Sequence, residues 1–152
     1  MDTLIIVGAK YLVFIVGFIA IAATLFSEKT IRNNILKLAI LSFPIAFLLA
    51  FIGGHFFFDT RPFVVENTPP LIPHAADNGF PSDHTLYAMV TATIIFVYNR
   101  RIGISLTILT ILIGVSRVMA RVHHPVDIIG SIAIAIVATY VGWLIVRRIN
   151  RA

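Results

Sequence analysis

Apolar residues fall into five long runs separated by shorter polar segments. The runs are Leu4–Phe26, Leu36–Phe58, Thr85–Tyr98, Ile102–Met119 and Val126–Val146. None shows the alternation of apolar and polar positions that marks the strands of a membrane barrel, so each run predicts a helix. Most approach the roughly 20 residues that span a bilayer. We therefore expect an all-α, polytopic transmembrane bundle with about five spanning helices.

Composition supports a single small membrane domain over residues 1–152. Hydrophobic residues make up 59% of the chain and charged residues 12%, about half the charged fraction of a soluble domain. The net charge of +5 would suggest nucleic acid in a soluble protein. Here it reflects basic segments between helices, so we expect no nucleic-acid partner. The absence of cysteine excludes disulfides, thiolate metal sites and thiol nucleophiles.

Charged residues predict how the helices are oriented. Lys29 and Arg32 follow the first run, Arg100 and Arg101 follow the third, and the C-terminal tail is also basic. The positive-inside rule places these segments and the C-terminus in the cytoplasm. All five histidines and six of the seven acidic residues then lie on the extracytoplasmic side. Acidic residues hardly affect topology, so this concentration predicts a polar site at the outer face.

The outer face also holds the one long connection, the proline-rich segment 59–82. Loops of this length in compact proteins are usually functional. Two arginines at this face, Arg61 and Arg117, are permanent cations whose planar forks match phosphate oxygens. Pro81-Ser82 opens a helix, so Ser82 is a good N-cap and the free N–H groups behind it favour an anion.

Histidines supply the reactive groups. His84 lies near that helix start as a possible proton donor. His123 and Asp127 are four residues apart, which puts them on one face if His123 is already helical. An aspartate that accepts a hydrogen bond from one imidazole nitrogen leaves the other free to attack. With the arginines, these groups suit phosphoryl transfer through a phosphohistidine.

These residues resemble the type-2 phosphatidic acid phosphatase superfamily. Ser116-Arg117, five residues, His123, three residues and Asp127 are similar to its third signature block. Pro81-Ser82-Asp83-His84 resembles the second block and Arg61-Pro62 the end of the first. The sequences Leu71–Asp77 and Phe80–Thr85 are similar to those of the bacitracin-resistance group of undecaprenyl-diphosphate phosphatases.

The resemblance implies a function and a role for each residue. The group removes the terminal phosphate of a polyprenyl diphosphate lipid at the outer face, without metal or other cofactor. His123 would be the nucleophile, Asp127 would orient it, and His84 would protonate the leaving group and then activate water. Arg61, Arg117 and Ser82 would hold the phosphate.

The chain departs from the family pattern in two places. The family has a lysine seven residues before the first-block arginine, where this chain has Gly54. The neighbouring His55 could replace it, or could pair with Asp59 four residues later. The family core has six helices, and we expect five here, with the first one missing.

Most of the other polar residues near the motifs have two possible roles. His124 is expected to support its neighbour. Asp83 could stabilise the helix start or hold His84 protonated. Arg121 could contact lipid headgroups or the substrate diphosphate. His74 and Asp77 could form a turn or contact the substrate.

Three other functions remain open at this point. The same chemistry could act on phosphatidylglycerophosphate or phosphatidate. The histidines and acids could instead bind a divalent cation, although the arginines disfavour it. A lipid-binding resistance factor without turnover is the third. The sequence does not indicate an oligomeric state.

Overall fold

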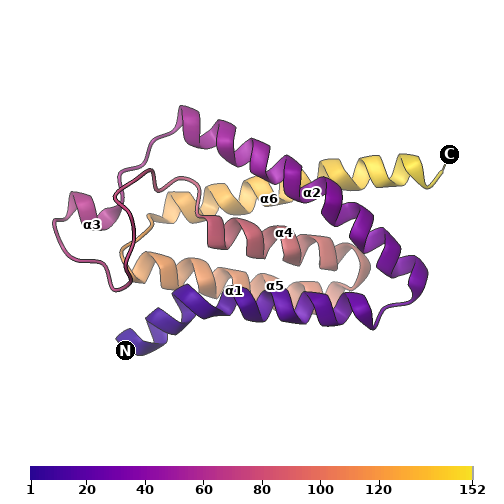
Figure 1. Ribbon diagram of the computed structural model, residues 1–152, viewed down its shortest axis with the longest axis horizontal. Coiled ribbons are helices and arrows are strands. Elements are labelled where there is room, and N and C mark those ends of the chain that lie inside the picture. The colour runs from indigo at the N-terminus through magenta and orange to yellow at the C-terminus, as the bar shows by residue number, and fades with distance from the viewer. Residues whose placement is uncertain (152) are drawn as a thin grey trace.

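The computed structural model describes residues 1–151 and is built from helices. They are α1 (Asp2–Leu25), α2 (Lys29–Phe56), α3 (Pro62–Val65), α4 (Asp83–Tyr98), α5 (Arg100–Met119) and α6 (Pro125–Ile149), as Figure 1 shows. The five long helices follow the five apolar runs, so the predicted all-α transmembrane bundle is confirmed. Four of them, α1, α2, α5 and α6, are long and apolar enough to cross a membrane.

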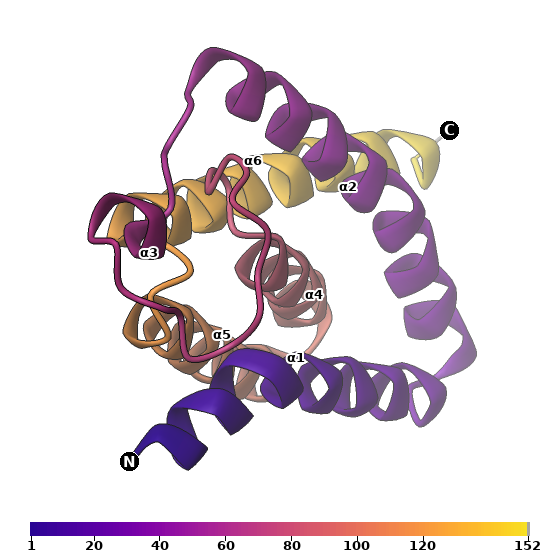
Figure 2. The ribbon, with the colours of Figure 1, turned by 60° about the vertical axis from the view of Figure 1, so that its left-hand side comes forward.

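Helix α4 forms the centre of the bundle. It packs against α1, α2, α5 and α6, and the second view places it among them (Figure 2). Half of its 16 residues are buried. At about 1.5 Å per residue it is shorter than the hydrocarbon core, but the surrounding helices cover it.

A tight turn joins α4 to α5. Asn99 ends α4 and caps α5, since its side-chain oxygen accepts a hydrogen bond from the Ile102 backbone N–H at 3.1 Å. A Cβ atom on Gly103 would lie 2.3 Å from Phe96 Cα. Only glycine therefore allows the two helices to approach this closely.

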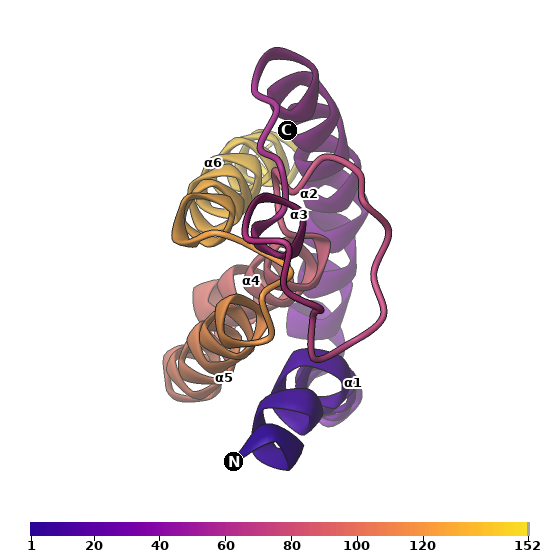
Figure 3. The same ribbon diagram turned by 90° about the vertical axis from the view of Figure 1, so that its left-hand side faces the viewer.

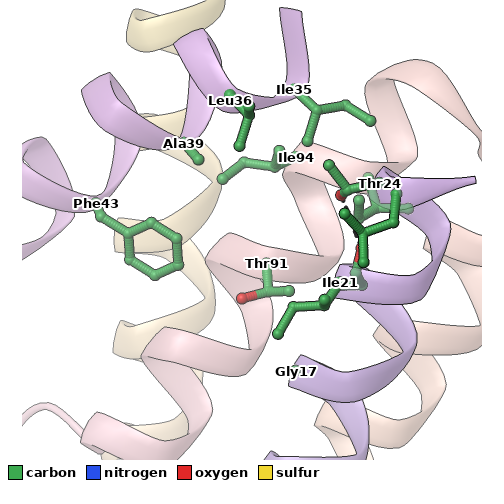
Figure 4. A pocket seen from close by; sticks show the side chains of 12 residues that line it. Gly17, Ile21, Thr24, Ile35, Leu36, Ala39, Phe43, Thr91 and Ile94 are labelled. Carbon is green, nitrogen blue, oxygen red and sulfur yellow. Dashed lines mark hydrogen bonds between the residues drawn. The ribbon is translucent and has the colours of Figure 1, made fainter. Parts of the chain in front are cut away.

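Helices α1 and α2 diverge from the turn that joins them and make few contacts with each other (Figure 2). Helix α2 continues through Pro44 and bends along its length, as a proline inside a helix predicts. An apolar pocket of about 360 Å³ lies between α1, α2 and α4, towards the α1–α2 turn (Figure 4). Its lining includes Ile21, Phe43 and Ile94.

The long connection between α2 and α4 crosses one end of the bundle (Figure 3). It contains the single-turn helix α3, which the apolar pattern did not predict, and an isolated β-bridge between Thr60 and Asn78. Proline at the first position of α3 suits a helix start. The same end of the bundle holds the start of α4 and the turn between α5 and α6, so the three predicted polar clusters do converge.

Candidate active site

His123 and Asp127 form a buried pair at the start of α6. His123 Nδ1 lies 3.1 Å from Asp127 Oδ2, and the two residues are 2% and 0% exposed. The same carboxylate oxygen accepts a hydrogen bond from the His124 backbone N–H at 2.9 Å. Helix α6 begins at Pro125, so His123 precedes the helix instead of lying in its first turn, yet the predicted pair forms.

Two buried arginines face the other nitrogen of His123. Its Nε2 atom lies 3.2 Å from Arg117 Nη2 and 3.5 Å from Arg61 Nη1. Both arginines are almost fully buried. Since Asp127 occupies Nδ1, the lone pair of Nε2 points at two cations. This is the geometry that a nucleophile for an anionic group requires.

Backbone carbonyl groups hold the arginines in place. Arg61 donates to the carbonyl oxygens of Val122 at 2.7 Å and Asn78 at 3.2 Å. Arg117 donates to the Ala9 carbonyl of α1 at 3.5 Å. The Nε–H of Arg117 is buried and has no partner within the described residues, so a donor is left for a phosphate oxygen.

Loop residues contact the same two arginines. Asp77 Oδ1 accepts a hydrogen bond from Arg61 Nε at 2.7 Å. His74 Nε2 lies 2.9 Å from Arg117 Nη2. Both loop residues that were expected to form a turn or contact substrate therefore lie at the arginines.

Ser82 and His84 bring the start of α4 to the site. Ser82 precedes α4 and is fully buried, but its hydroxyl lies 3.2 Å from the Thr85 hydroxyl instead of capping a backbone N–H. Its backbone N–H approaches the Asp127 carbonyl at 3.5 Å. His84 is half-buried, within electrostatic range of Arg117 and His123.

The expected pairing of His55 with Asp59 is wrong. Asp59 Oδ2 lies 2.6 Å from His124 Nδ1 instead, because α2 ends at Phe56 and the chain turns towards α6. His55 is exposed and packs edge-on against Phe56, with ring centres 5.3 Å apart. It makes no hydrogen bond to the site in the part of the chain that the structure describes, so its predicted replacement of the missing lysine gains no support.

Two other candidates lie at the edge of the site. Asp83 is exposed in the first turn of α4, where a carboxylate stabilises the helix start. Arg121 has a positive φ of 63° and donates to the Pro69 carbonyl at 3.3 Å. Arg121 therefore holds the loop against the turn between α5 and α6.

Two residues that support the site, Asn78 and Ser131, lie outside the motifs and were not predicted. Asn78 binds the backbone of Asp59 and of Phe80 through its side-chain oxygen and donates to the Gly54 carbonyl. The Ser131 hydroxyl donates to the carbonyls of Ser82 and Asp127, at 2.9 and 2.7 Å. Ser131 follows Asp127 by four residues, so helical spacing alone could have placed it on the same face.

The buried arginines of the site suit an anion, and the one cluster of possible metal ligands in the described part of the chain is engaged in hydrogen bonds. Asp59, His124 and Asp127 bring three possible ligand atoms within 4.8 Å of one another. Asp59 Oδ2 and His124 Nδ1 are already hydrogen bonded to each other, and Asp127 Oδ2 is bonded to His123 Nδ1 and to the His124 backbone N–H.

Burial and the arginines keep His123 and His74 neutral. Burial lowers the pKa of His123 below its usual 6.5, the hydrogen bond to Asp127 opposes this, and Arg117 and Arg61 reinforce it. Burial, then Arg61 and Arg117, lowers the pKa of His74 to about 4. A neutral His123 keeps the Nε2 lone pair available near pH 7.

Comparison with known proteins identifies one family. The profile of the PAP2 superfamily matches residues 12–151. Undecaprenyl-diphosphatase BcrC of Bacillus subtilis (strain 168) is 34% identical over 147 residues, which cover 97% of this chain and 74% of that protein. Putative undecaprenyl-diphosphatase YbjG of Escherichia coli (strain K12) is 32% identical over 133 residues, 87% of this chain and 67% of that protein.

Two crystal structures share the fold. LpxE of Aquifex aeolicus is 25% identical with a TM-score of 0.69, and the match covers 93% of this chain and 81% of that one. A transmembrane PAP2 type phosphatidylglycerolphosphate phosphatase of Bacillus subtilis is 20% identical with a TM-score of 0.64, and covers 97% and 75%.

Proposed function

The chain belongs to the PAP2 superfamily, and from that premise we propose that it hydrolyses undecaprenyl diphosphate to undecaprenyl phosphate and inorganic phosphate. The observation that carries the proposal is the position of His123, with Asp127 at one ring nitrogen and two buried arginines at the other. The 34% identity to a diphosphatase over nearly the whole chain supports the substrate. Such an activity recycles the carrier lipid for cell-wall synthesis and gives resistance to bacitracin.

The reaction proceeds in two steps. His123 Nε2 attacks the terminal phosphorus, a P–N bond forms, and the bond to the bridging oxygen breaks. His84 in its protonated form donates a proton to the leaving lipid phosphate and becomes neutral. Water then attacks the phosphorus of the phosphohistidine and gives a proton to His84, and the P–N bond breaks. This step releases inorganic phosphate, restores neutral His123 and returns His84 to its protonated form. No cofactor takes part, since the arginines stabilise the charge that develops on the phosphoryl oxygens.

Each remaining residue of the site has a role in this scheme. Arg61 and Arg117 bind the transferred phosphoryl group from two sides, and the start of α4 at Ser82 contributes backbone N–H groups. Asp127 fixes the tautomer of His123 by accepting from Nδ1.

The apolar tail of the substrate stays in the bilayer. Helices α1 and α2 diverge and leave part of α4 between them, where the apolar pocket lies (Figure 4). A polyprenyl chain that begins at His84 runs along α4 towards this pocket. The apolar lining of the pocket, and its position towards the end of α4 that lies away from the polar site, support this path.

The basic segments support an extracytoplasmic site. The start of α5, which carries Arg100 and Arg101, and the C-terminal end of α6 lie at the opposite end of the bundle from the turn between α5 and α6, which contains His123 (Figure 1). By the positive-inside rule this end faces the cytoplasm. The active site then opens to the outer face.

A second candidate substrate is phosphatidylglycerophosphate, because a PAP2 phosphatase named for it shares the fold. Phosphate release by the detergent-purified protein from both lipids, with EDTA present, decides between them. We expect release from the prenyl diphosphate and none from the His123→Ala variant. Release from the phospholipid alone would reassign the substrate, and release by His123→Ala would refute the mechanism.

A further inference from the structure

His74 lies beside the reacting histidine without a part in the two steps above. Its Nε2 atom is 2.9 Å from Arg117 Nη2, and the same arginine nitrogen is 3.2 Å from His123 Nε2. The rings of His74 and His123 are nearly perpendicular, with centres 6.0 Å apart. One guanidinium nitrogen therefore stands between the two imidazoles.

Hydrogen bonding leaves His74 incompletely satisfied. Because Arg117 can only donate, Nε2 of His74 accepts and Nδ1 carries the proton. That Nδ1 atom is buried and makes no well-formed hydrogen bond among the described residues, although the Ala75 backbone acts weakly on the ring. A buried donor without a partner is costly and uncommon in native structures. An acceptor supplied by the substrate would satisfy it.

We propose that His74 binds the phosphate that stays with the lipid and so selects diphosphates over monophosphates. The inference rests on the proposed function. A terminal phosphoryl group at His123 Nε2 lies against Arg117. The next phosphate is joined to it by a single bridging oxygen, so it falls beside the same guanidinium, which His74 also contacts.

The charged groups around His74 favour its contact with the second phosphate of the substrate. The titratable and charged groups that act on it or respond to it are Arg61, Arg117, His123, Asp77 and His84. Burial and the two arginines keep His74 neutral. The second phosphate adds negative charge beyond what the transferred group brings, and this strengthens the hydrogen bond that it accepts from Nδ1 of the neutral ring.

Binding of small phosphonates tests the inference without turnover. Calorimetry compares methylenediphosphonate with methylphosphonate on the purified protein. His74→Ala should weaken diphosphonate binding by about 10- to 100-fold, the range of one charge-assisted hydrogen bond, and change methylphosphonate binding by less than about twofold. Glu66→Gln, an exposed loop variant, is the matched control and should bind both as the wild type does.

Two results would overturn the assignment. Equal weakening for both ligands would mean that His74 only orders Arg117, and unchanged diphosphonate binding would mean that it does not contact the second phosphate. In turnover of farnesyl diphosphate, His74→Ala should raise KM much more than it lowers kcat. If the wild type releases no phosphate from lipid diphosphates but keeps the His74-dependent difference in binding, the proposed function fails and the His74 assignment stands.

Discussion

Exchange of Asp127 for asparagine tests the role of the buried His–Asp pair. The two side chains have the same shape, so the variant removes the charge and one acceptor atom while leaving the packing in place. Asp127 Oδ2 accepts from His123 Nδ1 and from the His124 backbone N–H. Its other oxygen, Oδ1, is buried and has no partner among the described residues.

Neither orientation of the asparagine amide fits this environment. With its oxygen at the Oδ2 position, both hydrogen bonds lose their charge, at about 1 kcal/mol each, and a buried NH₂ group is left unpaired. With its nitrogen there, the amide donates to His123 Nδ1 and forces the proton onto Nε2, which removes the nucleophile. The same exchange in a serine-protease triad lowers kcat by about 10⁴. We expect kcat to fall between about 10² and 10⁴-fold.

The assay is phosphate release in detergent, with thermal unfolding measured in parallel. Glu66→Gln is the matched acid-to-amide control, since Glu66 is exposed in the loop, and it should retain wild-type kcat. A folded Asp127→Asn variant with kcat within tenfold of the wild type would refute the reasoning. Asp127 would then be a helix cap and no more.

Three further predictions concern packing, pH and topology. Gly103→Val should lower the melting temperature, because any side chain there meets the backbone of Phe96. Gly17→Ala is the control: nothing lies within 4 Å of the added Cβ atom, so the melting temperature should stay unchanged or rise. A larger loss of melting temperature for Gly17→Ala than for Gly103→Val would contradict the helix packing. The acid limb of kcat/KM should have its midpoint below 6.5, because the lowered pKa of His123 keeps it unprotonated as pH falls; a midpoint above 6.5 would contradict this. Ala76→Cys, the only thiol in the chain, should react with an impermeant maleimide on intact cells, and labelling only after lysis would invert the topology.

The apolar pattern predicted most of the fold because a bilayer allows few alternatives. Runs of this length and hydropathy must be helical, and the five runs match the five long helices within a few residues at most ends. Helix α3 was not predicted because a single turn is too short to show an apolar periodicity. The central position of α4 was also not predicted, since a short apolar run does not show which helices will surround it.

Within the site, spacing along the chain predicted contacts that helices or motifs fix locally. His123 and Asp127 pair as expected because only three residues separate them. The partner of Asp59 was misassigned because i, i+4 spacing assumes a helix, and α2 ends before Asp59 is reached. The contacts of His74 and Asp77 with the arginines depend on the path of the long loop, which composition does not specify.

The most direct test of the central claim is detection of the covalent intermediate. The purified protein is mixed with undecaprenyl diphosphate, quenched in alkali to preserve phosphohistidine, digested and examined by mass spectrometry. We expect one phosphoryl group on the peptide that contains His123, and none in the His123→Ala variant. Phosphate release without that adduct, or an adduct on His84 instead, would contradict the assignment of His123 as the nucleophile.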